Sequence, residues 1–347
     1  MSALDNSALP AAPDYLLDVN DLAVHFPSGR KGASGKTSFV HAVDGVSFRV
    51  RRGTTFGIVG ESGSGKSTTA QAVMRLGPVT SGQVVFAGRN IADLSGSPLR
   101  EMRKHLQIVF QDPFSALNPR RRAGDQIREP LDLLGIGSRS ERDDRVRKLL
   151  VEVGLPPQAA DLFPHQFSGG QRQRLCIARA LAPEPDLIVC DEAVSALDVA
   201  IQAQILNLLK RLQRERRLTY IFISHDLGVI QQFCDEVAVM YLGKIVEQGS
   251  AAEIFTAPRH PYTWSLIAAA APPGPIRDAL KQRHLVKGDP PSPIDPPSGC
   301  RFAQRCPAAV ELCRQQLPSL DAIGPSHYVA CHRANDLASE ALTQLRT

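Results

Sequence analysis

The most informative chemistry in this chain lies in a glycine-rich stretch that begins at Gly60 and fits G-x-x-x-x-G-K-S through Ser67. Glycines let backbone N–H groups close around a triphosphate, while Lys66 can reach its β and γ oxygens and Ser67 can hold Mg²⁺. The run before it, Thr54 to Val59, is typical of a strand, and Lys66 to Leu76 is typical of a helix, as this chemistry requires. The residues expected to bind ATP here are Gly60, Glu61, Ser62, Gly63, Ser64, Gly65, Lys66, Ser67 and Thr68.

Two adjacent acids, Asp191 and Glu192, end a second apolar run that starts at Leu187. Acids at the carboxyl end of a strand beside a phosphate loop suit Mg²⁺ and the attacking water. Asp191 is therefore the expected metal partner and Glu192 the expected base that orients the water. Adjacent carboxylates alone are commonly a solvated strand end, so spacing to this point indicates a P-loop NTPase and nothing narrower.

The elements that must position these residues can be outlined from hydrophobic patterns. Residues 15 to 60 alternate apolar, β-branched runs with polar breaks, which predicts strands, with a surface loop from Pro27 to Lys36. Residues 118 to 182 carry amphipathic segments and little strand signal, which predicts a helical insertion. Strand character resumes at Asp186, so the expected fold class is α/β.

The composition is that of an ordinary globular protein, with 43% apolar and 22% charged residues among 347. The apolar runs are much shorter than the roughly 18 to 20 residues that span a bilayer. Residues 1–14 lack a basic region followed by an apolar stretch, so we expect a mobile tail and cytoplasmic residence. The net charge of +5 is too small an excess to indicate nucleic acid as a partner.

Four further motifs stand in order around the phosphate loop and the two acids. The stretch Phe167-Ser-Gly-Gly-Gln171 precedes the helix leading to Asp191 and resembles the ABC signature. Gln111 of Val-Phe-Gln-Asp-Pro resembles the Q-loop, Asp198 of Ser-Ala-Leu-Asp the D-loop, and His225 of Ile-Ser-His-Asp the switch histidine. The chain is therefore similar to the ATPases of ABC transporters.

This resemblance implies a P-loop NTPase core, residues 15–257, with a helical subdomain at about 112–184 and an antiparallel β subdomain. It implies a head-to-tail pair in which the signature residues of one subunit cover ATP held by the other. The aromatic that stacks on adenine is expected at Phe26, with His25 and His41 as alternatives. The implied roles are catalysis by Glu192, His225, Lys66 and Gln111; Mg²⁺ binding by Ser67, Gln111 and Asp191; and contact with the partner's ATP by Ser168, Gly169, Gly170 and Gln171.

A narrower resemblance, covering roughly residues 15 to 335, links the chain to oligopeptide and dipeptide importers and their nickel-transporting relatives. Phe110 to Pro119, Cys190 to Asp198 and Arg259 to Thr263 carry it. It implies ATP-driven uptake of dipeptides or oligopeptides, with nickel or another small solute as the alternative cargo. The implied partners are a second ATPase subunit in a heterodimer, two membrane-spanning permeases and an extracytoplasmic binding protein, all working at the cytoplasmic membrane.

The C-terminal part, residues 258–347, is rich in proline and holds four cysteines within 32 residues: Cys300, Cys306, Cys313 and Cys331. In a chain without an export signal, such a set indicates metal ligation rather than disulfides. Four thiolates suit either Zn²⁺ or an iron–sulfur cluster, and the spacing lacks the C-x-x-C pairs of most zinc ribbons. The resemblance implies a [4Fe-4S] cluster. The remaining cysteines are expected to be buried thiols: Cys176, Cys190 and Cys234.

Two other classes of protein share parts of this pattern. Soluble ABC ATPases that act on nucleic acid or ribosomes usually carry two cassettes, a long coiled coil or inserted zinc modules, and this sequence shows none of these features. A metal-binding regulator with a vestigial cassette would be expected to lose one of the residues Lys66, Asp191, Glu192 and His225, all of which are present.

Overall fold

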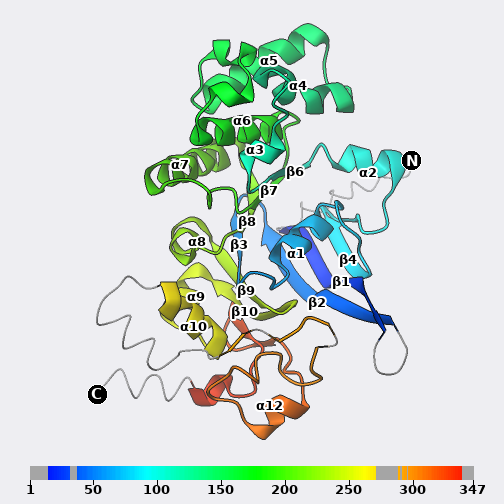
Figure 1. The fold of residues 1–347 in the computed structure, drawn as a ribbon, viewed down its shortest axis with the longest axis vertical. Coiled ribbons are helices and arrows are strands. Elements are labelled where there is room, and N and C mark those ends of the chain that lie inside the picture. Colours follow the sequence, from blue (N-terminus) through cyan, green and yellow to red (C-terminus); the bar gives the residue numbers. More distant parts are fainter. Residues whose placement is uncertain (1–14, 32–36, 271–287, 290, 295, 338–347) are drawn as a thin grey trace, which may run out of the picture.

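The computed structural model describes most of the chain, and the predicted mobile tail of residues 1–14 lies outside the described residues. Two β-sheets form the centre of the molecule, and a layer of helices covers one end of it (Figure 1). The mixture of helices and mostly parallel strands confirms the predicted α/β class. The described ranges are 15–31, 37–270, 288–289, 291–294 and 296–337.

The smaller sheet is antiparallel and has the order β2-β1-β4-β5. Its long hairpin pairs Pro27 with Phe39 and Lys31 with Thr37, so the strands run further than expected and the predicted loop from Pro27 begins too early. Proline is tolerated there because β1 ends in a two-stranded ribbon. The bounds of its strands are β1 (Tyr15–Lys31), β2 (Thr37–Arg51), β4 (Ser81–Phe86) and β5 (Arg89–Asn90).

The larger sheet has the order β11-β12-β10-β9-β3-β8-β7-β6, and its strands from β9 to β6 are parallel. β3, β7 and β8 are buried along their whole length, because elements cover both faces of a parallel sheet. Their carboxyl ends lie at one edge, where α/β sheets bind ligands. The central strands are β3 (Thr55–Val59), β6 (Leu106–Val109), β7 (Leu187–Asp191), β8 (Thr219–Ile223), β9 (Glu236–Tyr241) and β10 (Lys244–Ser250).

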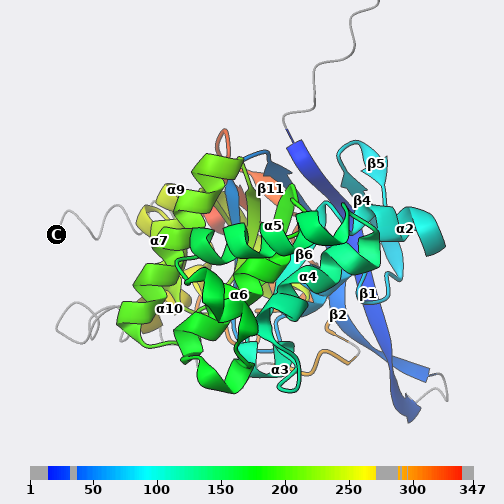
Figure 2. The same ribbon diagram turned by 90° about the horizontal axis from the view of Figure 1, so that it is seen from above.

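The segment between β6 and β7, which the structure describes in full, consists of helices joined by loops and contains no strand, which confirms the predicted helical insertion (Figure 1, green). Its helices bury an apolar face around Leu131, Leu149 and Leu175 in the main hydrophobic core. This layer lies over the carboxyl-end edge of the larger sheet, with α7 (Val199–Arg216) beside it in both views (Figures 1 and 2). Its elements are α3 (Pro113–Ala116), α4 (Ala123–Leu134), α5 (Arg139–Glu152), η1 (Pro157–Asp161), η2 (Pro164–Gln166) and α6 (Gly169–Leu181).

The C-terminal part packs directly on the larger sheet rather than standing apart from it. β12 pairs with β10 through Val329 and Glu247, while Tyr262 and Phe302 are fully buried in the main hydrophobic core. The predicted boundary between residues 257 and 258 thus crosses a shared core, and a separate C-terminal domain stays a prediction. Its elements are α10 (Pro261–Ala270), α12 (Glu311–Gln315), β11 (Asp321–Ala322) and β12 (Tyr328–Val329).

Four short helices complete the described fold. No helix in the described residues combines the length and the apolar character that crossing a bilayer requires. The four are α1 (Lys66–Val73), α2 (Gly96–Met102), α8 (Leu227–Phe233) and α9 (Ala251–Thr256).

Candidate nucleotide site

The glycine-rich loop lies between β3 and α1, as the motif requires. Gly65 has a φ of 105°, and a Cβ atom there would lie 2.2 Å from the carbonyl oxygen of Ala42, so no other residue fits. Gly63 also has a positive φ, 78°, but nothing lies within 4 Å of the position of its Cβ. There is thus open space beside Gly63, and a glycine-rich loop that leads into a helix is the arrangement that binds phosphate.

Lys66 lies across the inside of this loop. Its ammonium donates hydrogen bonds to the carbonyl oxygens of Gly60, at 3.0 Å, and Glu61, at 2.8 Å. Burial lowers its pKa, although the nearby carboxylates of Glu192 and Asp191 act in the opposite direction. A phosphate placed in the loop would take over these contacts, and its charge would favour the ammonium form.

The Asp191 carboxylate accepts a hydrogen bond of 2.9 Å from the Ser67 hydroxyl. Burial raises the pKa of Asp191 above its ordinary value, and the bond from Ser67 only partly offsets this effect. A buried carboxylate beside a hydroxyl is a pair of hard oxygen ligands, which Mg²⁺ prefers. These residues therefore fit a magnesium ion, whose charge would restore the ionised form of Asp191.

Glu192 connects the other two predicted catalytic residues. Its Oε2 accepts a hydrogen bond of 2.8 Å from Gln111 and lies 3.3 Å from Nδ1 of His225. The backbone of Glu192 has a φ of 50°, a left-handed conformation that side chains other than glycine seldom adopt. Strain of this kind is concentrated at functional sites, where the surrounding structure holds a side chain in a required direction.

Together these residues occupy the carboxyl edge of four strands that are adjacent in the order β3, β8, β7 and β6. Each strand contributes directly: β3 leads into the phosphate loop, β7 ends at Asp191, and His225 and Gln111 follow β8 and β6 by two residues. The structure therefore brings Lys66, Ser67, Gln111, Asp191, Glu192 and His225 together from distant parts of the sequence. The cluster combines a triphosphate cradle, magnesium ligands and a carboxylate able to orient water, while the individual roles stay predictions.

The signature residues belong to the helical layer and are not part of this cluster. The Ser168 hydroxyl caps α6 by accepting a hydrogen bond from the backbone N–H of Gln171. In return, the side-chain carbonyl of Gln171 accepts a hydrogen bond from the backbone N–H of Ser168. A Cβ atom on Gly170 would lie 2.5 Å from Ile201 of α7, whose cap is Asp198. Ser168, Gln171 and Asp198 are exposed, so a second chain can reach them.

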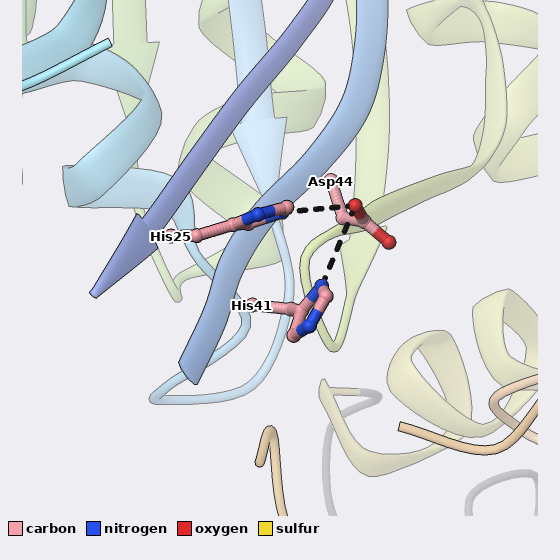
Figure 3. Close-up of side chains that lie close together, drawn as sticks. All are labelled: His25, His41 and Asp44. Atoms are coloured by element: carbon pink, nitrogen blue, oxygen red, sulfur yellow. Dashed lines mark hydrogen bonds and ion pairs between the residues drawn. The ribbon is translucent and has the colours of Figure 1, made fainter. Parts of the chain in front are cut away.

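The three aromatic candidates for adenine stacking differ in their surroundings. His25 and His41 both point toward Asp44, with ring centroids 4.1 Å apart (Figure 3). Burial opposes ionisation of Asp44, but Arg301 and Lys244 keep its pKa below the ordinary value. The two histidines are thus held against the Asp44 carboxylate. The side chain of Phe26 is 37% exposed, which leaves it the best placed of the three to contact a base.

All four C-terminal cysteines line one small pocket, together with Phe302. Burial raises the pKa of Cys306 to about 12, and the neighbouring thiols add to this effect. Within the described residues, none of the four belongs to a group of three ligands whose atoms all lie within 4.8 Å of one another. Cys176, Cys190 and Cys234 are buried in the main core, as expected of plain thiols.

Two residues beside the phosphate loop were not predicted from the sequence. The Glu61 N–H donates a 2.7 Å hydrogen bond to the Tyr262 hydroxyl, and the Glu61 carboxylate accepts two bonds from Arg305. Tyr262 belongs to the Arg-His-Pro-Tyr-Thr stretch, which carries the resemblance to peptide importers. The stretch does not indicate that Tyr262 contacts Glu61. Arg305 lies 244 positions from Glu61, and nothing in the local sequence pairs them.

Comparison with known proteins agrees with this geometry. Residues 43–195 match the ABC transporter family, and residues 246–313 match the oligopeptide/dipeptide transporter C-terminal region. The oligopeptide transport ATP-binding protein AppF of Bacillus subtilis is 47% identical over 323 residues, which cover 93% of this chain and 98% of AppF. A probable peptide ABC transporter ATP-binding protein of Sinorhizobium fredii is 50% identical over 319 residues, which cover 92% of this chain and 90% of that protein.

Solved structures show the same fold. The dimeric ATP-binding cassette MJ0796, in a post-hydrolysis state bound to ADP and Pi, is 29% identical with a TM-score of 0.59, covering 68% of this chain and 98% of the cassette. CbiO1 of Clostridium perfringens is 30% identical with a TM-score of 0.61, and the match covers 70% of this chain and 92% of CbiO1. The chain therefore belongs to the ATP-binding proteins of ABC transporters, within the oligopeptide/dipeptide transporter branch.

Proposed function

We propose that this chain is the subunit that binds and hydrolyses ATP to power uptake of dipeptides or oligopeptides through an ABC importer. The observation that carries the proposal is the coexistence of a complete nucleotide cluster with a C-terminal region of the peptide-transporter type. AppF and the Sinorhizobium relative, both named for peptide transport, support the substrate class.

The chemistry follows from what each side chain can do. The loop holds the triphosphate, Lys66 neutralises the β and γ oxygens, and Ser67 with Asp191 would hold Mg²⁺, which supplies charge neutralisation during transfer. Glu192 accepts a proton from the attacking water, with Gln111 and His225 fixing its carboxylate. The exposed signature of a second chain closes the site from the other side. We expect that second chain to be a different ATPase, giving a heterodimer.

The helical layer offers a surface for a permease. A groove there is lined by Phe110, Leu133 and Gln111, so it reaches the nucleotide cluster through the same glutamine that bonds Glu192. Phe110 and Leu133 are 40% and 60% exposed, an apolar surface suited to a partner helix. Docking of one permease there, and of the other on the second ATPase, would place the chain on the cytoplasmic face of the membrane. The binding protein would then work on the other face, and nucleic acid would not be a partner.

Uptake by the reconstituted transporter tests the substrate class. Vesicles holding ATP and both ATPases on the inside should accumulate a labelled dipeptide or oligopeptide only when the binding protein is present outside. A Lys66→Ala subunit should abolish accumulation, because the loop loses the cation that holds the phosphates. Accumulation of labelled nickel with no peptide uptake would reject the peptide assignment and favour the metal-transporting relatives.

We further propose that the four C-terminal cysteines hold a [4Fe-4S] cluster with a structural role. They line a single pocket, and their sulfurs are spread more widely than one zinc ion needs: tetrahedral Zn–S bonds of about 2.3 Å place sulfurs only about 3.8 Å apart. A cluster of four irons bridges a wider set of thiolates. Ligation would add ordering free energy to a segment with few elements of its own.

Metal content tests this assignment. Anaerobically purified protein should be brown and contain about four irons per chain. Cys306→Ser should lower the iron content and loosen the C-terminal segment, measured by limited proteolysis, whereas Cys176→Ser, in the main core, should retain the iron. One zinc per chain without iron would reject the cluster.

A further inference from the structure

The C-terminal segment reaches into the nucleotide site through one arginine. Arg305 donates one hydrogen bond of 2.9 Å to Oε2 of Glu61 and another of 3.1 Å to Oε1, so the pair is bidentate. Glu61 is the second residue of the phosphate loop. Arg305 directly precedes Cys306, one of the four cysteines that line the C-terminal pocket.

The surroundings make this pair stronger than an ordinary surface ion pair. The Arg305 side chain is only 10% exposed, and its guanidinium lies 5.7 Å from the ring centroid of Tyr241, whose hydroxyl accepts a further hydrogen bond of 3.3 Å. Bidentate arginine–carboxylate pairs with restricted access to water are well fixed in direction. The Tyr262 hydroxyl holds the backbone of the same residue, Glu61, at its N–H. Both side chain and main chain of Glu61 are therefore anchored to the C-terminal part.

A carboxylate on a loop built to hold a triphosphate presents an electrostatic problem. Without a cation beside it, the Glu61 charge would repel the phosphates, and the start of the loop would be free to turn that charge inward. Arg305 offsets the charge and fixes the carboxylate through two hydrogen bonds, while the Lys66 ammonium bonds the Glu61 carbonyl oxygen. Among the described residues, the only salt bridge of Glu61 is the one with Arg305.

We propose that Arg305 is a positioning residue for ATP: it holds the phosphate loop in its binding conformation through Glu61 and makes ATP affinity depend on the folded C-terminal segment. The inference rests on the proposed binding of ATP at this loop and adds a residue from outside the cassette motifs. The position of Arg305 also couples the cysteine segment to the phosphate loop, since displacement of Cys306 moves the adjacent Arg305.

Kinetics of the assembled transporter test the proposal. Arg305→Met should raise the KM for ATP about tenfold, as expected for one uncompensated charge near the triphosphate, and change kcat by less than about twofold. Arg305→Lys should lie between Arg305→Met and the unmodified protein, because an ammonium keeps the charge but not the bidentate geometry. Arg314→Met is the matched control, since Arg314 is exposed in the same segment, and its KM should not change.

The decisive variant is the double substitution. Glu61→Gln removes the charge that Arg305 offsets, so Glu61→Gln with Arg305→Met should bring the KM back to within about twofold of Glu61→Gln alone. A purely structural role for Arg305 would give no such rescue, and equal KM values for Arg305→Met and Arg314→Met would also overturn the proposal. Binding of a non-hydrolysable ATP analogue to the unmodified full chain is measured first; its absence would reject the proposed function itself and the inference with it.

Discussion

At the scale of single residues, the nucleotide site is a set of polar side chains that hold one another in place. Ser67 bonds Asp191, and Gln111 and His225 both approach the Glu192 carboxylate. Each contact joins segments that are far apart in the sequence: the start of α1 meets the end of β7, and the residues after β6 and β8 meet the residue after β7. Glu192 is central because its carboxylate contacts both Gln111 and His225, and because its backbone adopts a strained left-handed conformation.

Glu192→Gln tests this arrangement. The amide cannot accept a proton from water, so turnover should fall on the order of a hundredfold or more. ATP binding should persist because the phosphate loop and Asp191 are unchanged, and ATP should trap a closed dimer that gel filtration detects. Near-normal turnover in this variant would remove Glu192 from its catalytic role.

The residues of this site were largely predictable from the sequence, because each lies in a short motif next to a strand or helix whose pattern is visible locally. The loop from Gly60 to Ser67 and the pair Asp191 and Glu192 are of this kind. The contacts of Glu61 with Tyr262 and Arg305 were not predictable, since they depend on how distant segments pack. The choice of Phe26 as the adenine contact stays a prediction.

At the scale of elements, the helical layer joins the nucleotide cluster at Gln111, so we expect it to carry changes at the nucleotide to its outer surface. Gln111 stands between β6 and α3, where the larger sheet passes into the helical layer. Phe114 of α3 is 63% exposed, and the Arg172 guanidinium of α6 lies 3.9 Å from its ring centroid. This contact ties α3 to the helix that begins at the signature, so the two are expected to move together.

Crosslinking tests whether this surface meets a permease. Phe114→Cys and Asn118→Cys should each crosslink to a cysteine placed in a cytoplasmic helix of the permease, with the yield changing when ATP is added. Val151→Cys is the control, because Val151 is 57% exposed on α5 of the same layer. Equal yields from Val151→Cys and Phe114→Cys, or unaltered transport after substitution of both predicted contacts, would reject this surface as the docking site.

At the scale of the whole molecule, the C-terminal part is built into the cassette. β12 extends the larger sheet beyond β10, Phe302 packs in the main core, and Arg301 and Arg305 reach Asp44 and Glu61. Sequence patterns indicated a distinct segment because prolines and cysteines dominate it, and they could not show this packing. Strands of two residues such as β12 give no periodic signal, and their pairing depends on long-range contacts.

Hydrolysis of ATP by this chain to drive peptide import can be measured as the ATPase rate of the complete transporter in vesicles. We predict Mg²⁺-dependent hydrolysis that rises severalfold when peptide-loaded binding protein is added, and that falls to background when this subunit carries Lys66→Ala. Hydrolysis that is absent, or that is unaffected by both the peptide-loaded binding protein and Lys66→Ala, would contradict it.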